Sequence, residues 1–468
     1  MTDPYLLMIA ITLVTLAHYF FVGRHAGLLT LDSLFVLTQW LMASGTLVIL
    51  DPSDPADRVY ALVICVPLVV YTITSTLAHW YLRAGRDDTL GSQKPPVRVY
   101  RPTIAVWILL LLSCAITIAY YRAVGYNTLT VGIQGLVSGE DVNVSVMRPD
   151  FFSGTHYLFP GYVNQFKNSI LPALTLVVAV YLFHVHHPRR RLITIPLITL
   201  AVFGIVGTGQ RGAFIQFILI LLVFLFHLNP SRFFRRATVA VVTTIPLLFL
   251  TTFFLRRSAG SLADTPDIAG KLLIIGRELG KRVFNDNQVS GQAGFRYTYG
   301  QPTQNGADWL TSILGILPNN AGSSLPSEIF QTLYGSNSGT APPSMWGSTF
   351  YNFGWPGILL LPIALAIIFQ TITFRTSRRP AVNTLELIGM SGTYVILGNW
   401  VAGGPEYLLN AGAVTFAILW WMGRRAAPSR QLGVLDPDQE RSGALVRSSG
   451  AESHRRDPRA NPIPALRR

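Results

Sequence analysis

One turn in the sequence combines glycines with a single arginine: residues 207–212 are Gly-Thr-Gly-Gln-Arg-Gly and lie between two apolar segments. Glycine lets a backbone reverse within a few residues, and a turn that opens a helix leaves backbone N–H groups without partners. Arginine adds a planar set of donors that matches the oxygens of a phosphate group. The turn therefore predicts a site for an anionic group, phosphate above all, with Arg211 as a ligand.

The same turn fits two other interpretations. Its spacing matches G-x-G-x-x-G, but the dinucleotide fingerprint needs a strand before it and a soluble βαβ unit around it. Both neighbours here are long apolar segments, which disfavours a nucleotide site. Arg211 at a helix end can also extend to lipid headgroups without binding a ligand, and this alternative stays open.

The composition indicates the class of protein that carries the turn. Of the 468 residues, 50% are hydrophobic and 13% are charged, and the apolar residues come in long blocks. That pattern is typical of an all-α, polytopic integral membrane protein. The two cysteines, Cys65 and Cys114, lie inside apolar blocks, so neither a disulfide framework nor a metal site is indicated. The net charge of +14 falls mostly in short loops and the tail, which indicates membrane orientation and not nucleic-acid binding.

The apolar blocks predict about eleven transmembrane helices within residues 1–424, with no cleavable signal peptide. The predicted spans are residues 4–23, 31–50, 59–82, 104–121, 169–183, 193–208, 213–228, 237–255, 350–374, 385–402 and 407–422. Arg and Lys concentrate in the loops of one side, which should be cytoplasmic. The N-terminus is then outside, the C-terminus lies in the cytoplasm, and the glycine-rich turn faces outward.

Two extracytoplasmic loops are too long to be simple connectors: residues 122–168, and residues 256–349 between spans 8 and 9. Long loops of this kind usually carry function. The larger loop contains Trp309, Trp346 and short apolar runs, which predicts a folded cap, and residues 268–284 have the spacing of an amphipathic helix. That helix could lie on the membrane surface or pack against the bundle. Residues 425–468 are expected to form a disordered cytoplasmic tail.

Cations on the outward side run against the orientation rule and need a reason. They cluster near the membrane in the sequence: Arg211, Arg256, Arg257, Lys271, Arg277, Lys281, Arg282 and Arg296. An anionic lipid-linked ligand would explain them, since a pyrophosphate offers oxygens to two or three arginines. The apolar segments themselves contain almost no charged residues.

Three features together resemble the bacterial O-antigen polymerases, also called oligosaccharide repeat-unit polymerases. They are the outward turn, the large late loop, and the run Trp-Gly-Ser-Thr-Phe-Tyr-Asn-Phe-Gly-Trp-Pro-Gly at residues 346–357. The resemblance covers the general layout from about Leu192 to the last span. It departs from the family at residues 344–347, Ser-Met-Trp-Gly, where many members carry an acidic residue.

The resemblance implies a metal-independent glycosyltransferase of membrane-embedded, GT-C-like architecture that uses no cofactor. It would transfer a growing glycan from polyprenyl pyrophosphate onto the next lipid-linked repeat unit, at the outer face of the bacterial cytoplasmic membrane. By position, Arg211 matches the family's turn arginine, whereas the pyrophosphate-binding candidates Arg256, Arg277, Arg282 and Arg296 match by region only. The implied partners are a polyprenyl-pyrophosphate-linked oligosaccharide, membrane lipid and a chain-length regulator or flippase, without nucleic acid.

Arginines that stabilise the leaving pyrophosphate would supply much of the catalysis, and a base would activate the acceptor hydroxyl. The outward candidates for this base are Asp150, His156, Asp308, Glu328 and Glu406. We favour Glu328, with His156 next, and a structural role for each stays open.

Two other functions remain open. A transporter or flippase of a lipid-linked or anionic solute would need ionisable residues within its spans or a repeated half, and the sequence displays neither clearly. A related ligase, which joins a finished glycan to a different acceptor, would share the donor site.

Overall fold

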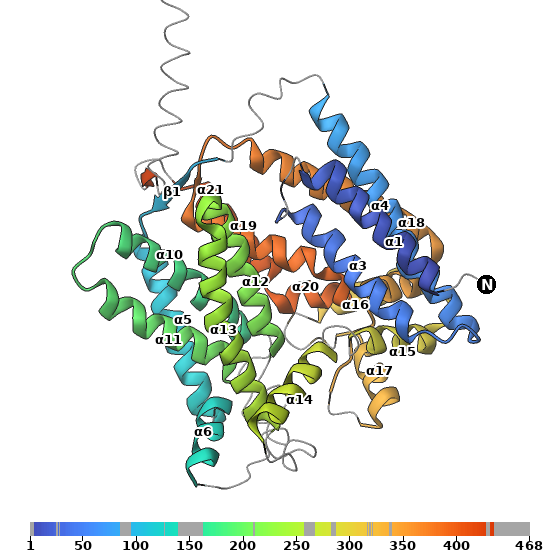
Figure 1. Ribbon diagram of the computed structural model, residues 1–468, viewed down its shortest axis with the longest axis horizontal. Coiled ribbons are helices and arrows are strands. Elements are labelled where there is room, and N and C mark those ends of the chain that lie inside the picture. The colour runs from blue at the N-terminus through green and yellow to red at the C-terminus, as the bar shows by residue number, and fades with distance from the viewer. Residues whose placement is uncertain are drawn as a thin grey trace, which may run out of the picture.

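The computed structural model describes residues 4–24, 27, 29–84, 95–125, 127–138, 162–208, 211–256, 267–281, 287–315, 317, 320, 322–336, 339–426 and 431–434. Helices make up most of this part of the chain (Figure 1).

The first three long helices pack with a late helix, on the right of Figure 1. They are α1 (Pro4–His18), which continues as the π-helical turn η1 (Tyr19–Gly23), α3 (Leu31–Ile49), α4 (Pro55–Arg83) and α18 (Met345–Ser377). Side chains mark where two of them begin: the Thr30 hydroxyl accepts a hydrogen bond from the Ser33 N–H, and the Asp54 carboxylate accepts one from the Ala56 N–H. Such caps satisfy N–H groups that have no partner within the helix.

The middle of the chain forms the rest of the bundle. Its helices are α5 (Ile104–Val124), α6 (Thr128–Ser138), α9 (Tyr162–Gln165), the π-helical turn η3 (Phe166–Ile170), α10 (Leu171–His184), α11 (Arg190–Val206), α12 (Arg211–Leu228), the short η4 (Pro230–Arg232) and α13 (Phe233–Arg256). Helix α10 packs against α11, and α12 packs against α13. Because α9, η3 and α10 run on without a break, they form one long helical segment.

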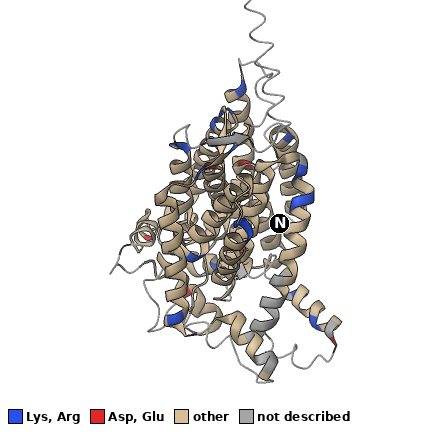
Figure 2. Cartoon of the chain, turned by 90° about the vertical axis from the view of Figure 1, so that its left-hand side faces the viewer, with Lys and Arg blue, Asp and Glu red and all other residues tan. Residues whose placement is uncertain are grey.

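Six helical segments of the described chain are long and apolar enough to cross a membrane: Pro4–Gly23, Leu31–Ile49, Pro55–Arg83, Ile104–Val124, Tyr162–His184 and Met345–Ser377. A shorter apolar helix covers Gly212–Leu228. Most of the length of the helices carries neither basic nor acidic residues (Figure 2). The chain is therefore an all-α membrane protein, whereas the count of eleven spans stays a prediction.

A small sheet, which the sequence analysis did not anticipate, ties together three distant segments at one end of the bundle. Strand β1 (Val97–Tyr100) pairs in parallel with β2 (Val382–Asn383) and antiparallel with β3 (Gln431–Val434), in the order β2-β1-β3. Strand β3 lies inside the tail that was expected to be disordered. We call this end of the bundle, where α5 and α19 (Thr384–Gly398) begin, the strand end.

The opposite end carries most of the large loop, along the lower side of Figure 1, and we call it the cap end. Its helices are α14 (Ile268–Lys281), α15 (Asn287–Thr298), α16 (Ala307–Leu314) and α17 (Leu325–Tyr334). Helix α15 packs against α4, α17 and α18, and α14 packs against α13. The prediction of a folded segment with an amphipathic first helix is confirmed for these residues.

The last two predicted spans are interrupted helices. After α19 the chain makes the short helix η7 (Trp400–Ala402), then α20 (Pro405–Ala411) and α21 (Ala413–Arg424). Between α20 and α21, Gly412 has φ +96°, a left-handed conformation that favours glycine and ends the first helix. Helix α21 has 12 residues, which is shorter than the roughly 20 that a straight span needs.

Glycines let α19 and α21 touch along their backbones. A Cβ atom on Gly389 would lie 2.2 Å from the Trp420 nitrogen, and one on Gly392 would lie 2.0 Å from the Phe416 ring. Small residues at a helix contact are a common way of packing helices in membranes, where van der Waals contact drives association.

Candidate functional site

The glycine-rich turn joins α11 to α12 and is held by the far end of α5. The Gly207 carbonyl accepts a hydrogen bond from the Thr128 N–H at 2.8 Å, and the Tyr121 hydroxyl donates one to the Gly204 carbonyl at 2.8 Å. A Cβ atom on Gly207 would lie 1.8 Å from Asn127 Nδ2. Glycine is therefore required at position 207 by close packing, and these contacts hold the end of α11 at the cap end.

Arg211 is the first residue of α12, a helix of 18 residues. The first N–H groups of a helix have no partner within it and attract anions. The side chain of Arg211 lies outside the part of the chain that the structure describes. Phosphate binding by Arg211 therefore stays a prediction, supported by its place at a helix start.

A buried lysine that the sequence analysis did not single out lies beside the turn. Lys167, in η3, has 0% exposure, and its Nζ donates a hydrogen bond to Asn168 Oδ1 at 3.2 Å and lies 5.3 Å from the centre of the Tyr120 ring. Within the described residues no carboxylate pairs with this ammonium group. A buried ammonium group without a counter-charge is costly, so an anion bound nearby would stabilise the charged form of Lys167.

Three of the carboxylates predicted as candidate bases meet at the cap end. Asp308 of α16, Glu328 of α17 and Glu406 of α20 surround the first part of α18, where the charges of Asp308 and Glu328 both act on Tyr351. Asn352 Nδ2 lies 3.3 Å from Asp308 Oδ2, and Asp308 also lies close enough to raise the pKa of Glu406. Residues far apart in the sequence thus form one acidic group beside the run at 346–357.

Each carboxylate is positioned by a polar neighbour. Asp308 Oδ1 accepts a short hydrogen bond from the Ser323 hydroxyl, and Tyr297 donates one to Glu328. Glu406 accepts a hydrogen bond from the Gly404 N–H at 3.0 Å. Burial, above all, raises the pKa of Glu406, and the negative charge of Asp308 raises it further. A carboxylate with a raised pKa is a stronger base than a solvated one.

A break within α18 shapes this group. Gly354 has φ +59° and ψ −152°, a conformation that only glycine adopts readily. In the turn before the break, the Tyr351 carbonyl accepts a hydrogen bond from the Gln304 N–H at 3.0 Å. The loop before α16 is therefore fastened to the broken turn of α18, close to Asn352.

Helix α20 connects the acidic group to the helical segments that carry Lys167 and Arg211. Glu406 stands at its start, and at its end Gln165 Nε2 donates to the Leu409 and Asn410 carbonyls at 3.0 Å each. Gln216 of α12 donates to the Ala411 carbonyl at 2.9 Å. Because seven residues of helix span about 10 Å, the acidic and basic groups lie on opposite sides of one short element.

The remaining predicted site residues differ in outcome. Arg277 is exposed on α14, away from the helix face that buries Ile275. Arg256 is the last residue of α13, and its side chain is outside the described part of the structure. His156 and Arg282, and the alternative base Asp150, lie outside the described residues altogether.

Arg296 of α15 forms an ion pair with the start of α4. Its Nε and Nη2 atoms each donate to the Asp57 carboxylate at 2.8 Å, and its Nε lies 3.1 Å from Asp54 Oδ2. Gln292 also donates to Asp57, which is 1% exposed. A phosphate-binding role for Arg296 stays a prediction, but the guanidinium already holds the cap to the bundle.

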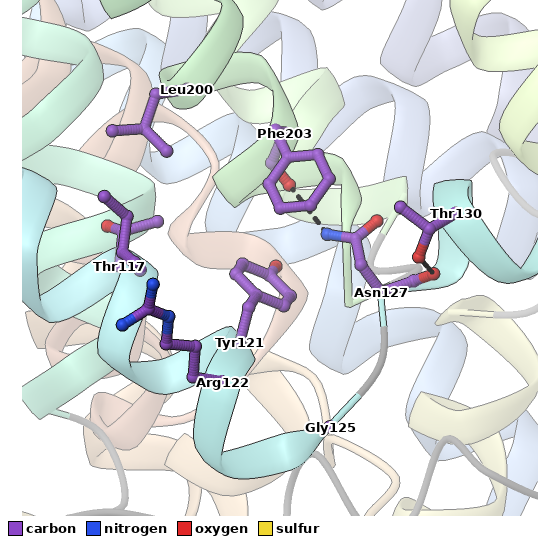
Figure 3. A pocket seen from close by; sticks show the side chains of 9 residues that line it. Thr117, Tyr121, Arg122, Gly125, Asn127, Thr130, Leu200 and Phe203 are labelled. Carbon is purple, nitrogen blue, oxygen red and sulfur yellow. Dashed lines mark hydrogen bonds between the residues drawn. The ribbon is translucent and has the colours of Figure 1, made fainter.

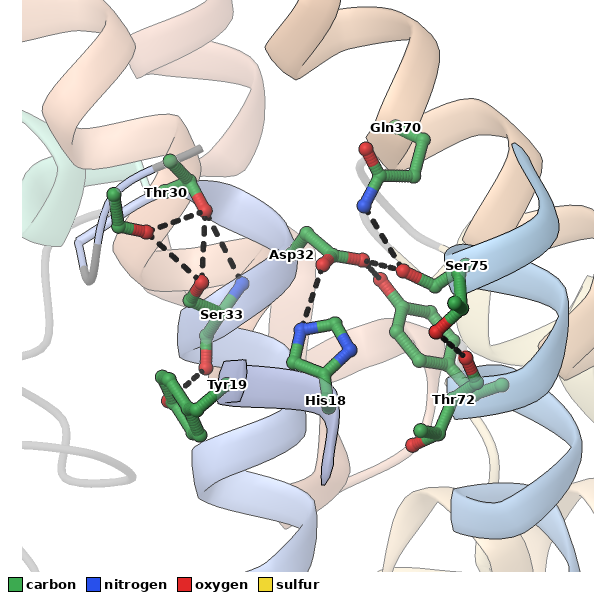
Figure 4. Close-up of polar contacts among 11 residues, drawn as sticks. His18, Tyr19, Thr30, Asp32, Ser33, Thr72, Ser75 and Gln370 are labelled. Carbon is green, nitrogen blue, oxygen red and sulfur yellow. Dashed lines mark hydrogen bonds and ion pairs between the residues drawn. The ribbon is translucent and has the colours of Figure 1, made fainter. Parts of the chain in front are cut away.

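A buried ion pair, with polar partners around it, links α1, α3, α4 and α18 (Figure 4). It is contrary to the expectation that the apolar segments contain almost no charged residues. His18 Nε2 lies 2.9 Å from Asp32 Oδ2, and both side chains are 0% exposed. Tyr71 and Ser75 of α4 donate to Asp32 Oδ1 at 2.7 and 2.8 Å, and Gln370 of α18 donates to Ser75. Sequence reasoning missed the pair because each residue stands alone in an apolar block.

The chain matches no protein-family model, no curated protein and no solved structure among those with which it was compared. What the fold and its polar groups define is a class: a helical membrane protein with a polar, two-sided site at one end of its bundle.

Proposed function

We propose that this protein polymerises polyprenyl-pyrophosphate-linked oligosaccharide repeat units at the outer face of the cytoplasmic membrane. The observation that carries the proposal is the placement of the two polar groups at the cap end. One side is basic and consists of the start of α12, the glycine-rich turn and Lys167. The other side, beyond α20, is acidic and consists of Asp308, Glu328 and Glu406. A transferase that splits a sugar–pyrophosphate bond needs both kinds of group close together.

In the proposed reaction the basic side binds the pyrophosphate of the donor lipid. Cations and helix N–H groups stabilise the negative charge that develops on this leaving group as its bond to the sugar breaks. On the other side a carboxylate removes the proton of the acceptor hydroxyl, which then attacks the anomeric carbon. Glu406, whose pKa is raised by burial, and Glu328, which the sequence favoured, are the candidates for this base. The proposal requires no metal ion, because the protein's own cations neutralise the leaving group.

The decisive experiment supplies purified protein in liposomes with a polyprenyl-pyrophosphate-linked repeat unit and follows glycan length on a gel. A ladder of lengthening products is the expected result. The Arg211→Ala variant should form no ladder while it inserts and accumulates normally, and Arg211→Lys should restore only part, since a point charge cannot replace the two-pronged guanidinium. The exposed Arg101→Ala at the strand end is the matched control. Normal polymer from Arg211→Ala would mean that Arg211 only contacts headgroups.

A transporter or flippase is the second candidate, and one observation favours it. Ionisable residues buried within membrane helices often belong to ion or substrate pathways, and His18 and Asp32 are such a pair. In the same liposomes, a flippase would carry the lipid-linked unit across the bilayer at a length of one repeat. That result, with no ladder, would replace the polymerase proposal.

A further inference from the structure

A groove opens between the ends of α5 and α11, directly beside the glycine-rich turn (Figure 3). Its volume is about 280 Å³. Its lining is Thr117, Ile118, Tyr121, Arg122, Gly125, Asn127, Thr130, Leu200 and Phe203. Small-ligand sites usually measure about 300–1,000 Å³, so a groove of this size suits one end of a ligand.

The walls of the groove are held in place by hydrogen bonds. Tyr121 is tied to the Gly204 carbonyl, and Asn127 Nδ2 donates to the Phe203 carbonyl at 3.4 Å while its Oδ1 accepts from the Leu129 N–H at 2.9 Å. Gly125 ends α5 with φ +83°. These contacts fix the groove before any ligand arrives, which lowers the entropic cost of binding.

Arg122 gives the groove a positive charge, and a second basic side chain, Lys167, lies close by. Arg122 lines it, is exposed, and has no carboxylate partner in the described part of the chain. Lys167 lies behind the wall of the groove, next to Gly204. Gly204 lies close to both the lining and Lys167, since a Cβ atom on it would be 3.1 Å from Thr117 Cγ2 and 3.7 Å from Lys167 Cβ. The lining contains no acidic residue. An anionic group is the complement of such a surface.

Below Arg122 an apolar stripe runs down the exposed side of α5. Ile108, Leu111 and Ile118 are 59%, 64% and 44% exposed, and Ala115 between them is exposed as well. Their spacing of three and four residues places them on one helix face, with Arg122 next in the same row. Helix α5 is one of the six membrane-length segments, so this stripe faces the hydrocarbon of the bilayer. A chain lying along it ends at the guanidinium.

We infer that the groove binds the phosphate of a membrane lipid, with the lipid chain along the exposed stripe of α5. Arg122 contacts the phosphate oxygens, and the bound anion stabilises the charged form of Lys167 behind the wall, which in turn strengthens the binding. In the proposed reaction the donor is such a lipid, and to that extent the inference rests on the proposed function. The phosphate would lie next to the helix start that carries Arg211.

The test measures binding of a long-chain polyprenyl monophosphate to the purified full-length protein in detergent, by native mass spectrometry. Removal of the charge in Arg122→Gln should weaken binding by about tenfold or more, since it removes the paired hydrogen bonds of the guanidinium. Lys167→Met, close in shape but neutral, should weaken it several-fold. Arg101→Gln at the strand end should leave it unchanged. Ile118→Trp, which fills the groove from an exposed position, should block binding while Arg122 is intact.

Three further probes separate the sources of the phosphate. The same polyprenol without phosphate should bind much more weakly, and inorganic phosphate should not compete at matched concentrations. Phosphatidylglycerol that binds with the same dependence on Arg122 would extend the inference to other anionic lipids. Equal binding of the free polyprenol, efficient competition by inorganic phosphate, or unchanged binding to Arg122→Gln would each overturn it.

The outcome is distinguishable from failure of the proposed function. Lipid-phosphate binding that depends on Arg122, in a protein that forms no glycan ladder, would keep the groove and remove the polymerase. A ladder formed equally well by Arg122→Gln, with unchanged lipid binding, would keep the polymerase and remove the groove.

Discussion

At the scale of single residues, the ion pair between Arg296 and Asp57 determines how the cap is attached. Asp57 is buried and accepts hydrogen bonds from Arg296, from Gln292 and from the Asp51 N–H. Replacement of Arg296 by Gln removes the charge and leaves a buried carboxylate with fewer donors. Because the Arg296 side chain is 42% exposed, water compensates part of the loss, and we expect destabilisation of about 1–3 kcal/mol. Thermal unfolding in detergent measures this change.

The control is Arg101→Gln, an exposed arginine with no such partner among the described residues, which should unfold at the wild-type temperature. If Arg296→Gln kept full stability but lost polymer formation, the residue would act mainly on substrate, as the sequence analysis predicted. Loss of stability, with activity retained at low temperature, would establish that Arg296 mainly holds the cap to the bundle.

Glu406 gives a second prediction at the residue scale, on pH. Its pKa lies above the ordinary 4.5 because the carboxyl is buried. A base must be deprotonated, so activity should fall as the pH is lowered through this raised value. Glu406→Gln should reduce the rate by about 10²–10⁴-fold at all pH values. Rates of glycan extension measured across the acidic range would provide the profile.

The companion variant is Asp308→Asn, which removes the negative charge that raises the pKa of Glu406. The acidic limb of the pH–rate profile of this variant should move to lower pH, whatever the effect of the substitution on the maximal rate. An unmoved limb would mean that Glu406 is not the titrating base.

At the scale of elements, the break in α18 positions Tyr351 and Asn352 beside the carboxylates. Gly354→Ala forces a side chain into a backbone conformation that glycine alone adopts readily, at a cost of about 1–3 kcal/mol. The variant should unfold at a lower temperature and, if folded, extend glycans poorly. Gly280→Ala in α14 is the matched control, since a Cβ atom there meets nothing within 4 Å. Equal stability of the two variants would contradict the role of the break.

The contact between α19 and α21 yields a separate prediction. Gly389→Ala would place a methyl group 2.2 Å from the Trp420 backbone nitrogen, so the two helices must move apart. We expect a loss of about 1–3 kcal/mol or more, since backbone atoms cannot move aside as a side chain can. Gly212→Ala, where a Cβ atom has open space, serves as the control for thermal unfolding. A normal unfolding temperature for Gly389→Ala would mean that the helices are less closely packed.

Some of these elements could be predicted and others could not, for physical reasons. Long apolar blocks such as residues 104–121 identify α5 almost to the residue, because hydrophobic length alone determines a membrane helix. The break at Gly412 and the short α21 could not be recognised, since a glycine inside an apolar run looks the same in a straight helix.

The candidate site divides in the same way. The turn at 207–212 and the three carboxylates were singled out as candidates from residue type and position. Lys167 and the His18–Asp32 pair were missed, because one ionisable residue in an apolar block carries no signal of the partner or helix that it faces. The convergence of Asp308, Glu328 and Glu406 depends on contacts between segments far apart in the sequence, which single-sequence patterns do not contain.

At the scale of the whole molecule, the orientation rule and the two ends of the bundle lead to one prediction. If the cap end faces outward, a cysteine at exposed Gln331 of α17 should react in intact cells with a maleimide that cannot cross membranes. A cysteine at exposed Arg101, beside β1, should react only after the cells are made permeable. Both variants need the native Cys65 and Cys114 replaced first. Labelling of Arg101→Cys alone in intact cells would reverse the orientation.

The small sheet can be completed only late in the synthesis of the protein. Strand β1 is synthesised early, but its partners β2 and β3 follow only after nearly all of the helices. Until these partners are synthesised, β1 has unpaired backbone groups at the strand end. The third strand closes the sheet only when the last helix has left the ribosome. A polypeptide cut short before residue 431 therefore leaves one edge of β1 without its antiparallel partner, and an unpaired edge can pair with another chain.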